Sequence, residues 1–390
     1  SLTGETFSLL LISNVNLIGA GEELTILDAE HSYRVITMEE CNNNTISDLN
    51  LTNGYAYGNN PDDRGGGMYL HSSNPELNNV TISNNTANFA GGGMILLSSN
   101  PTLNNVTISN NTVSDGDGMI ISIDGGGIYL YSSNPTLSYV TITGNTATDN
   151  GGGMFLSYSN PTLNNVTISN NSANYAGGMS LSASNPTLTN SIVWGNSHES
   201  IYLYNDPWID NANTEPIITC SNIQSGWEGE GNIDTDPLFT DPENGDYTLQ
   251  ESSPCIDVGT AYLEIVGEVI VDLNESEYIG SAPDMGAYEY NPLSIDKPVE
   301  ILPIKYSLEY PYPNPFNPKT SISFSIPEQS QTSIKVFDIK GNLISTLLNE
   351  SINVGHHQIK WNAEGYPSGV YFVKLDAGEF TQTQKLMLVK

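Results

Sequence analysis

The sequence predicts an all-β protein, with a parallel β-helix (a solenoid of stacked coils of β-strands) followed by a small antiparallel β-sandwich. Three observations lead to this fold class. A unit of 26 residues repeats along the chain. No segment shows the periodicity of an amphipathic helix. Residues 307–390 contain short alternating runs separated by turn residues, which is typical of an antiparallel sandwich.

A Ser-Asn-Pro tripeptide marks the repeat. Glycines and an alternating segment such as GGGMYLHS precede it, and a strand-like run such as PTLNNVTISNNT follows it. The Asn residues of the tripeptides are Asn74, Asn100, Asn134, Asn160 and Asn185, at steps of 26, 34, 26 and 25 residues. The longest step contains an inserted segment, SDGDGMI, and weaker copies flank the series. One unit cannot bury its apolar face alone. Three strands per unit, stacked about 4.8 Å apart, would form a continuous core.

Alternation within each run predicts which side chains point into the solenoid. Three inward stacks are expected. The first contains Met68/Leu70, Met94/Leu96, Ile128/Leu130, Met154/Leu156 and Met179/Leu181. The second contains Leu77, Leu103, Leu137, Leu163 and Leu188. The third contains Val80/Ile82, Val106/Ile108, Val140/Ile142 and Val166/Ile168.

The polar repeats have a structural interpretation. One Asn recurs in the same turn of each coil, where Asn tolerates left-handed backbone and stacked amides can bond along the solenoid. These residues are Asn85, Asn111, Asn145, Asn171 and Asn196. We interpret them as a structural ladder rather than a ligand site. The Gly triplets are interpreted as points of close backbone approach or positive φ, not as phosphate-binding loops.

Charge limits the partners of the chain. It has 44 acidic and 11 basic side chains, for a net charge of −33. Residues 291–390 are neutral, so residues 1–290 carry the whole charge, with Arg34 and Arg64 as their two bases. Such a surface repels nucleic acid and anionic lipid, and no apolar run is long enough to span a bilayer. Neutral glycans and cations are compatible with it.

Cys41, Cys220 and Cys255 form no disulfide framework; Cys220 with Cys255 is the one pair we consider.

The repeats resemble those of secreted bacterial right-handed β-helix proteins, with pectate-lyase-like architecture. The opening NVNLIGAGEELTILDAE resembles the first coils of such proteins, and earlier coils are expected to be missing. The stretch from GNIDTDPLFTDPENGD to APDMGAYEY looks like the end segment that often follows such coils. We therefore expect coils over residues 1–205, and acidic final coils with a cap over residues 206–290. The resemblance carries no activity, because this architecture serves enzymes, adhesins and stalks alike.

The C-terminal segment resembles the type A sorting domain of substrates of the type IX secretion system. The resemblance covers residues 307–390, after a Pro-containing linker at residues 291–306. It rests on YPNPFNPKTSISFSIP, VFDIKGNLISTL, GHHQIKW, PSGVYFVKL and the terminal KLMLVK. It implies interaction with that secretion machinery and export to the outer cell surface of a Gram-negative, Bacteroidetes-like bacterium. The export domain is often removed afterwards.

Two places could support chemistry on polysaccharides. The first is Asp62, Asp63 and Arg64, where a base and metal-binding carboxylates could meet for lyase chemistry. The second holds acids of the insertion and of the next coil, because hydrolysis needs two carboxylates about 5–10 Å apart. These acids are Asp115, Asp117, Asp124 and Asp149. A solvated turn and a polar loop are the simpler interpretations of the two places.

The outward positions of the first strand in each coil suggest a binding surface. Aromatic side chains recur there, and exposed rings can stack on sugars or anchor a protein partner. The residues are Tyr69, His71, Tyr129, Tyr131, Phe155, Tyr202 and Tyr204. Cross-strand packing, or coverage by a loop, would explain them equally well.

A calcium site is a weaker expectation. Asp234, Asp236, Asp241 and Asp246 lie close together in sequence and could supply oxygen ligands. Acidic solvation explains them more simply. The preferred interpretation requires no cofactor, and Ca²⁺ is the one cofactor that these sites could use.

Taken together, the sequence predicts a secreted surface protein that binds an extracellular polysaccharide or a surface protein without catalysis, or serves a structural role. A polysaccharide lyase or glycoside hydrolase is the first alternative. Self-association into a filament, through the aromatic stripe or the open sheet edges at the solenoid ends, is the second.

Overall fold

The computed structural model describes residues 7–114, 123–204, 214–292, 305–308, 311, 313–327, 329–378 and 380–390. The chain forms two compact units, Ser1–Pro292 and Leu293–Lys390. Within the described ranges there is no α-helix, and one 3-10 turn, η1, spans Pro242–Asn244. The all-β prediction is therefore confirmed. No described helix is long and apolar enough to cross a membrane.

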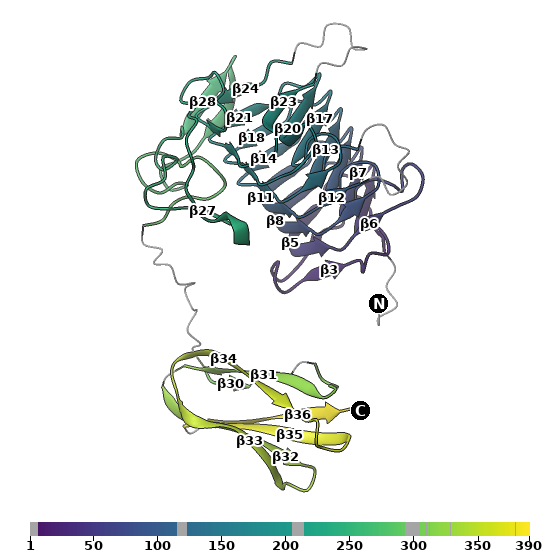
Figure 1. The fold of residues 1–390 in the computed structure, drawn as a ribbon, viewed down its shortest axis with the longest axis vertical. Helices are drawn as coiled ribbons and strands as arrows, with labels where there is room; N and C mark the ends of the chain where they lie inside the picture. Colours follow the sequence, from purple (N-terminus) through teal and green to yellow (C-terminus); the bar gives the residue numbers. More distant parts are fainter. Residues whose placement is uncertain are drawn as a thin grey trace. The chain divides into compact units, whose positions relative to one another are not determined.

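Parallel sheets build the first unit (Figure 1). Sheet 1 runs in the order β1 (Leu9–Leu11), β4 (Ile36–Glu39), β7 (Met68–His71), β10 (Met94–Leu97), β13 (Ile128–Tyr131), β17 (Met154–Ser157), β20 (Ala176–Ser182) and β23 (Glu199–Leu203). A small third sheet contains β6 (Tyr55–Ala56), β9 (Thr86–Ala87), β12 (Thr112–Val113) and β16 (Thr146–Ala147).

Sheet 2 is larger because most coils contribute two strand segments to it, joined by a residue with positive φ such as Tyr139 or Asn165. Its strands are β2 (Leu17–Ile18), β3 (Ile26–Asp28), β5 (Thr45–Thr52), β8 (Glu76–Ser83), β11 (Thr102–Ser109), β14 (Thr136–Ser138), β15 (Thr141–Thr143), β18 (Thr162–Asn164), β19 (Thr167–Ser169), β21 (Thr187–Thr189), β22 (Ile192–Trp194), β24 (Ile217–Thr219) and β25 (Asn222–Ile223).

The predicted inward stacks form the core. Met68, Met94, Ile128, Met154 and Met179 pair in register along sheet 1. Every residue of the three predicted stacks is at most 2% exposed. The interior is apolar and in register over all five repeats, as stacking of identical units requires.

Asparagine and glycine hold the turns of adjacent coils together. The Asn111 side chain accepts hydrogen bonds from the Asn85 backbone N–H and from Asn85 Nδ2, both at 3.0 Å, and donates to Ile82 O. The predicted Asn ladder is thus confirmed as a structural element. The expected left-handed backbone lies one residue earlier in each coil, at Asn84, Asn110, Gly144, Asn170 and Gly195. The glycines permit close approach, because a Cβ on Gly66 would lie 2.4 Å from Thr86 O and 2.5 Å from Gly92 O.

The stack ends differently from its repeats. β24 and β25 continue sheet 2 beyond β21 and β22. Residues 236–290, here called the flank segment, then lie along the outer side of sheet 2 and form two short hairpins (Figure 1). The hairpin strands are β26 (Phe239–Asp241) with β27 (Asp246–Leu249), and β28 (Tyr262–Ile265) with β29 (Glu268–Asp272).

Hydrogen bonds join the flank segment to several coils. The Ala287 N–H donates to Thr167 Oγ1 at 3.0 Å, and Asn165 Nδ2 donates to Asp284 O at 3.0 Å. Asn190 Nδ2 donates to Thr260 O at 2.9 Å.

All three cysteines are free thiols, so Cys220 and Cys255 are not bonded to each other. Burial raises the pKa of the Cys255 thiol to about 11.

The second unit is an antiparallel sandwich, as predicted. One sheet contains β30 (Ser307–Leu308), β31 (Lys319–Ile326) and β34 (Gly355–Asn362). The other runs β33 (Leu343–Ile352), β32 (Ser330–Asp338), β35 (Gly369–Ala377) and β36 (Phe380–Leu388). Their inner faces form one core that includes Phe324, Val336, Trp361 and Val373.

Candidate functional site

The outward side of sheet 1 is the surface on which a binding site was predicted. One register position, here called the outer row, contains Thr37, Tyr69, Ile95, Tyr129, Phe155, Ser180 and Tyr202. The expectation that its aromatic residues are exposed is wrong for Tyr69 and Phe155, which are 5% and 7% exposed.

Loop cover and cross-strand packing explain this burial. Tyr69 and Ile95 form a small cluster with Ala90, and Phe89 packs against it. Phe89 and Ala90 belong to the turn before a Gly triplet, which therefore folds over sheet 1. The ring of Phe155 stacks on Tyr129 with 5.2 Å between ring centroids. Burial raises the pKa of Tyr129 to about 12, and the charge of Asp124 acts in the same direction.

Both arginines of the solenoid lie against aromatic rings near the start of this row. The Arg34 guanidinium lies 4.7 Å from the Tyr69 ring centroid. Arg64 lies 4.4 Å from the centroid of Phe89, and its Nε is 3.4 Å from Asp63 Oδ1. Burial lowers the pKa of Arg34, and the nearby Asp62 carboxylate partly offsets that effect. Two of the predicted lyase residues, Asp63 and Arg64, thus form an ion pair with each other.

Five tyrosines remain at the surface farther along sheet 1, and we call them the tyrosine face. The rings of Tyr131 and Tyr158 meet edge to face at 6.0 Å, with 45% and 47% of each residue exposed. The ring centroid of Tyr202 lies 6.3 Å from the ring centroids of both Tyr175 and Tyr204. Tyr131 shares one register position with Ser157 and Ser182, and Tyr204 directly follows Leu203, which pairs with Leu181 in the next coil. Tyrosines therefore lie on both sides of a stretch with small side chains.

Tyr158 and Tyr175 were missed by the sequence reasoning. Tyr158 directly follows β17 with a φ of 51°, and Tyr175 directly precedes β20. Both lie outside the alternating runs, so the alternation could not identify them. The predicted His71 is exposed and occupies the register position of Tyr131 two coils earlier.

The predicted acidic cluster holds coils together where the structure describes it. Asp124 Oδ1 accepts hydrogen bonds from the backbone N–H of Asn150 at 3.1 Å and from its Nδ2 at 2.9 Å. Asp149 Oδ2 accepts one from the Ile123 N–H at 3.0 Å. Asp115 and Asp117 lie outside the described residues. Asp124 and Asp149 therefore each fasten one coil to the next.

The four aspartates considered for calcium support local turns. Asp236 Oδ1 accepts the Leu238 N–H at 2.9 Å, and Asp246 Oδ1 accepts the Thr248 N–H at 3.0 Å. Asp234 accepts from the Ser225 N–H, and Asp241 from the Asn244 amide. No cluster of three or more His, Cys, Asp or Glu suited to a metal occurs in the described part of the chain. The structure does not bring these four carboxylates into one site.

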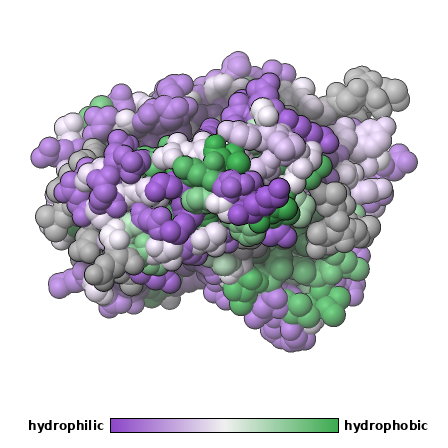
Figure 2. All heavy atoms as spheres, turned by 90° about the horizontal axis from the view of Figure 1, so that it is seen from below, coloured by the Kyte–Doolittle hydropathy of each residue, from purple (hydrophilic) through white to green (hydrophobic). Residues whose placement is uncertain are grey.

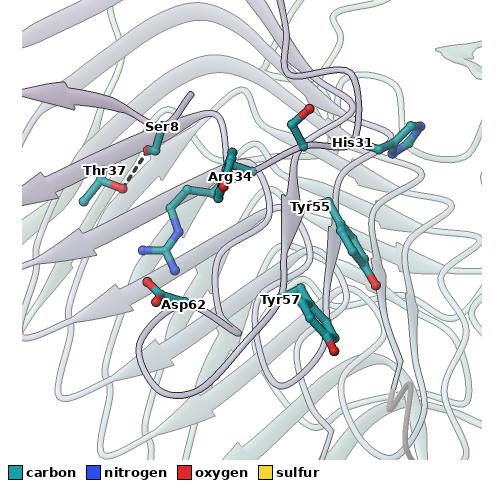
Figure 3. Close-up of a pocket in the computed structure, with 9 residues that line it drawn as sticks. Ser8, His31, Arg34, Thr37, Tyr55, Tyr57 and Asp62 are labelled. Atoms are coloured by element: carbon teal, nitrogen blue, oxygen red, sulfur yellow. Dashed lines mark hydrogen bonds between the residues drawn. The ribbon is translucent and has the colours of Figure 1, made fainter. Parts of the chain in front are cut away.

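Two hollows open on the first unit. One, of about 480 Å³, is lined by Arg34, Asp62, Tyr55 and Tyr57 among others, at the N-terminal end of the outer row (Figure 3). The other, of about 560 Å³, lies between sheet 2 and the flank segment, where Thr107, Asn110 and Asn170 face Tyr247 and Tyr288. Its lining is mainly hydroxyl and amide groups.

One face of the molecule, seen in Figure 2, is mainly hydrophilic, with separate apolar patches. With 44 acidic and 11 basic residues in the chain, the hollows lie in a negative field.

Comparison with known proteins matches one segment of each unit to a family model. Residues 311–390 match the family model described as secretion system C-terminal sorting domain, and residues 119–226 match the model described as right handed beta helix region. Searches of curated proteins and of solved structures found no match. The chain therefore combines a right-handed β-helix region with a type IX C-terminal sorting domain, which directs secretion to the cell surface.

Proposed function

We propose that the solenoid is a non-catalytic binding element, displayed on the outer surface of a Gram-negative bacterium, whose tyrosine face holds a neutral extracellular glycan. The observation that carries this proposal is the exposure of Tyr131, at the end of β13, and of Tyr158 and Tyr204, directly after β17 and β23. Tyrosine offers an apolar ring for the C–H face of a sugar and a hydroxyl for hydrogen bonding. Because residues 1–290 carry the whole net charge of −33, a neutral glycan is favoured over an acidic one.

The geometry supports catalysis less well. Glycoside hydrolysis needs two carboxylates about 5–10 Å apart across the scissile bond. Asp124 and Asp149 instead accept hydrogen bonds from neighbouring coils. A lyase needs a group that removes a proton, and an arginine whose guanidinium stays protonated is a poor base. A polysaccharide lyase or hydrolase is therefore the less supported alternative.

A binding experiment tests the proposal. The full chain would be run through native gels containing individual neutral or acidic polysaccharides, with and without Ca²⁺. We expect retardation by a neutral polysaccharide, and a rise of about tenfold in Kd, equivalent to about 1.4 kcal/mol, when Tyr131 or Tyr204 is replaced by alanine. Tyr262→Ala is the matched control, since Tyr262 is 55% exposed on the flank segment and lies outside the tyrosine face.

Two results would contradict the proposal. New absorbance at 235 nm or new reducing ends would show catalysis. Retention that Tyr131→Ala and Tyr204→Ala leave unchanged would place the glycan elsewhere. Retention of a purified surface protein, but of no glycan, would replace the ligand class with a protein partner.

Self-association is a second candidate, because large apolar side chains are exposed on the first described coils. They are Leu10, Ile12, Ile18, Leu24 and Ile26, between 54% and 78% exposed. Exposed apolar patches and unpaired strand edges favour contact with another chain. Sedimentation velocity of the full chain and of a Leu10→Lys, Ile18→Lys variant tests this. Self-association predicts concentration-dependent oligomers that the variant loses.

A further inference from the structure

The hollow at the start of sheet 1 has two chemically different walls. Arg34 and Asp62 lie on one side, with Ser8 and Thr37 beyond them, and the rings of Tyr55 and Tyr57 lie on the other (Figure 3). The Ser8 and Thr37 hydroxyls bond to each other at 2.8 Å. The volume of about 480 Å³ is within the range of about 300–1,000 Å³ typical of small-molecule sites.

Arg34 is buried but has unused hydrogen-bonding capacity. The residue is 7% exposed, and among the described residues its guanidinium donates one hydrogen bond, from Nη2 to Pro61 O. A guanidinium carries five N–H donors. The Tyr69 ring at 4.7 Å fixes the position of the group without using a donor. Its remaining N–H groups are therefore available to a ligand in the hollow that Arg34 lines.

The opposite wall provides a flat aromatic surface. Tyr55 and Tyr57 are two residues apart, and their rings are nearly parallel, with an interplanar angle of 8° and 5.9 Å between centroids. Tyr57 is 61% exposed and Tyr33, which also lines the hollow, is 63% exposed. Exposed rings beside a concave polar site are typical of ligand recognition.

The charges around the hollow select against anions. Asp62, Asp63 and Glu39 all lie near enough to Arg34 to favour its charged form. Asp62 is exposed and can accept hydrogen bonds from a ligand hydroxyl. The hollow thus combines cationic donors, a carboxylate acceptor and an aromatic surface, with no excess of positive charge. Asp63 is paired with Arg64, and the remaining acids, Asp62 and Glu39, outnumber Arg34, so a carboxylate or phosphate is disfavoured.

We propose that this hollow binds a neutral sugar unit, whose hydroxyls bond to Arg34 and Asp62 while its C–H face stacks on Tyr57. This site is separate from the tyrosine face, because three coil steps, about 14 Å, separate the strand of Thr37 from that of Tyr131. It does not require that the tyrosine face binds glycan. The two sites can be tested independently by mutation.

The test uses the full chain and calorimetric titration with cellohexaose, xylohexaose, mannohexaose and maltohexaose, and with oligogalacturonate as the acidic probe. We expect one neutral oligosaccharide to bind. Tyr57→Ala and Asp62→Ala should each raise its Kd by about tenfold or more. Both side chains are exposed, so the fold should be retained. Asp62→Asn, which keeps an acceptor oxygen, should lose less affinity than Asp62→Ala.

Tyr131→Ala is the matched control for the tyrosine face. Affinity that falls with Tyr57→Ala and Asp62→Ala, but not with Tyr131→Ala, supports the hollow even if the tyrosine face binds nothing. Affinity that falls only with Tyr131→Ala overturns the assignment and leaves the tyrosine face as the site. Binding of none of the neutral probes, or of oligogalacturonate alone, also overturns it.

Discussion

The Asn ladder and the outer row of sheet 1 are contributed by the same coils but differ in residue type and in exposure to solvent. The ladder has one residue type, Asn, in five successive coils, and each side chain is at most 8% exposed. The outer row changes residue type from coil to coil, and its exposure varies from buried Tyr69 to partly exposed Tyr202. Identical residues occupy identical surroundings inside the stack. On the outside, the turn before each Gly triplet decides the surroundings, and that turn is variable.

Invariant and variable positions of the repeat have different roles. Arg64, Ala90 and Asp124 occupy equivalent positions before successive Gly triplets, yet one stacks on an aromatic ring, one covers Tyr69 and one bonds to Asn150. Sequence identity between repeats therefore indicates a structural role. Variation between repeats indicates where local packing, and any binding function, is set.

The largest effect is expected from breaking the ladder with Asn111→Ala. The Asn85 N–H, Asn85 Nδ2 and Ile82 O all lose their bond to this buried side chain. Asn85 Nδ2 keeps its bond to Leu51 O, so two groups lose a partner. Each unsatisfied buried group costs about 1–3 kcal/mol, so the free energy of unfolding should fall by about 2–6 kcal/mol. Urea denaturation followed by circular dichroism measures it.

Asn134→Ala is the control for that substitution. Asn134 belongs to the Ser-Asn-Pro tripeptides, and its Oδ1 accepts the Asn160 N–H in an exposed position. Water can replace this bond, so a loss of about 0.5–1.5 kcal/mol is expected. Equal losses for Asn111→Ala and Asn134→Ala would show that burial of the ladder has no energetic importance.

The next effect separates buried from exposed aromatic residues of sheet 1. Tyr69→Ala should lower the free energy of unfolding by about 3 kcal/mol, because it removes a buried ring that contacts Ala90, Ile95 and Arg34. Tyr131→Ala should change it by about 0.5 kcal/mol, since that ring is 45% exposed. Thermal unfolding of both variants gives the comparison. A Tyr131 variant as unstable as the Tyr69 variant would argue that the tyrosine face is structural.

The smallest of the three effects appears at alkaline pH. The pKa of Tyr129 is about 12 in the folded chain, against about 10 for an unfolded tyrosine. Between pH 10 and 12 the unfolded state therefore releases this proton while the folded state keeps it, so stability is complete below pH 10 and falls as pH rises. The loss amounts to about 2.5 kcal/mol by pH 12.

Tyr129→Phe isolates that contribution. The variant should lose less stability than the wild type between pH 10 and pH 12, and its absorbance at 295 nm should show one late-titrating tyrosine fewer. An unchanged slope of stability against pH would mean that Tyr129 ionises normally in the folded chain.

The coils could be predicted from sequence because their interior is local and periodic. Alternation places Met68 and Leu70 inward, and repetition at a fixed step sets the register with Met94 and Leu96. Both alternation and repetition are visible in the sequence, so the core and the Asn ladder could be predicted from them. The C-terminal sandwich was predictable for a similar reason, through its alternating runs and the turn residues that separate them.

The binding surface could not be predicted in the same way. Alternation shows that Tyr69 points outward, but not that Phe89 and Ala90 fold over it from another turn. The hollow combines Arg34, Tyr57 and Asp62 from three places that share no repeat. The carboxylates of Asp124 and Asp149 have their hydrogen-bonding partners in neighbouring coils, and their sequence spacing does not reveal whether such partners exist.

The flank segment has a consequence for how this solenoid can change in length. It forms hydrogen bonds with residues as far apart as Thr141 and Asn190. It therefore connects several consecutive coils, and its own length is fixed. Duplication or deletion of a coil between Thr141 and Asn190 would shift one set of hydrogen-bonding residues by about 4.8 Å relative to the flank segment. Those hydrogen bonds would then be lost. Coils before Thr141 carry no such constraint from the described flank residues. Gain and loss of repeats should therefore be tolerated in the N-terminal part of the stack, which contains the hollow lined by Arg34. They should destabilise the coils that the flank segment contacts.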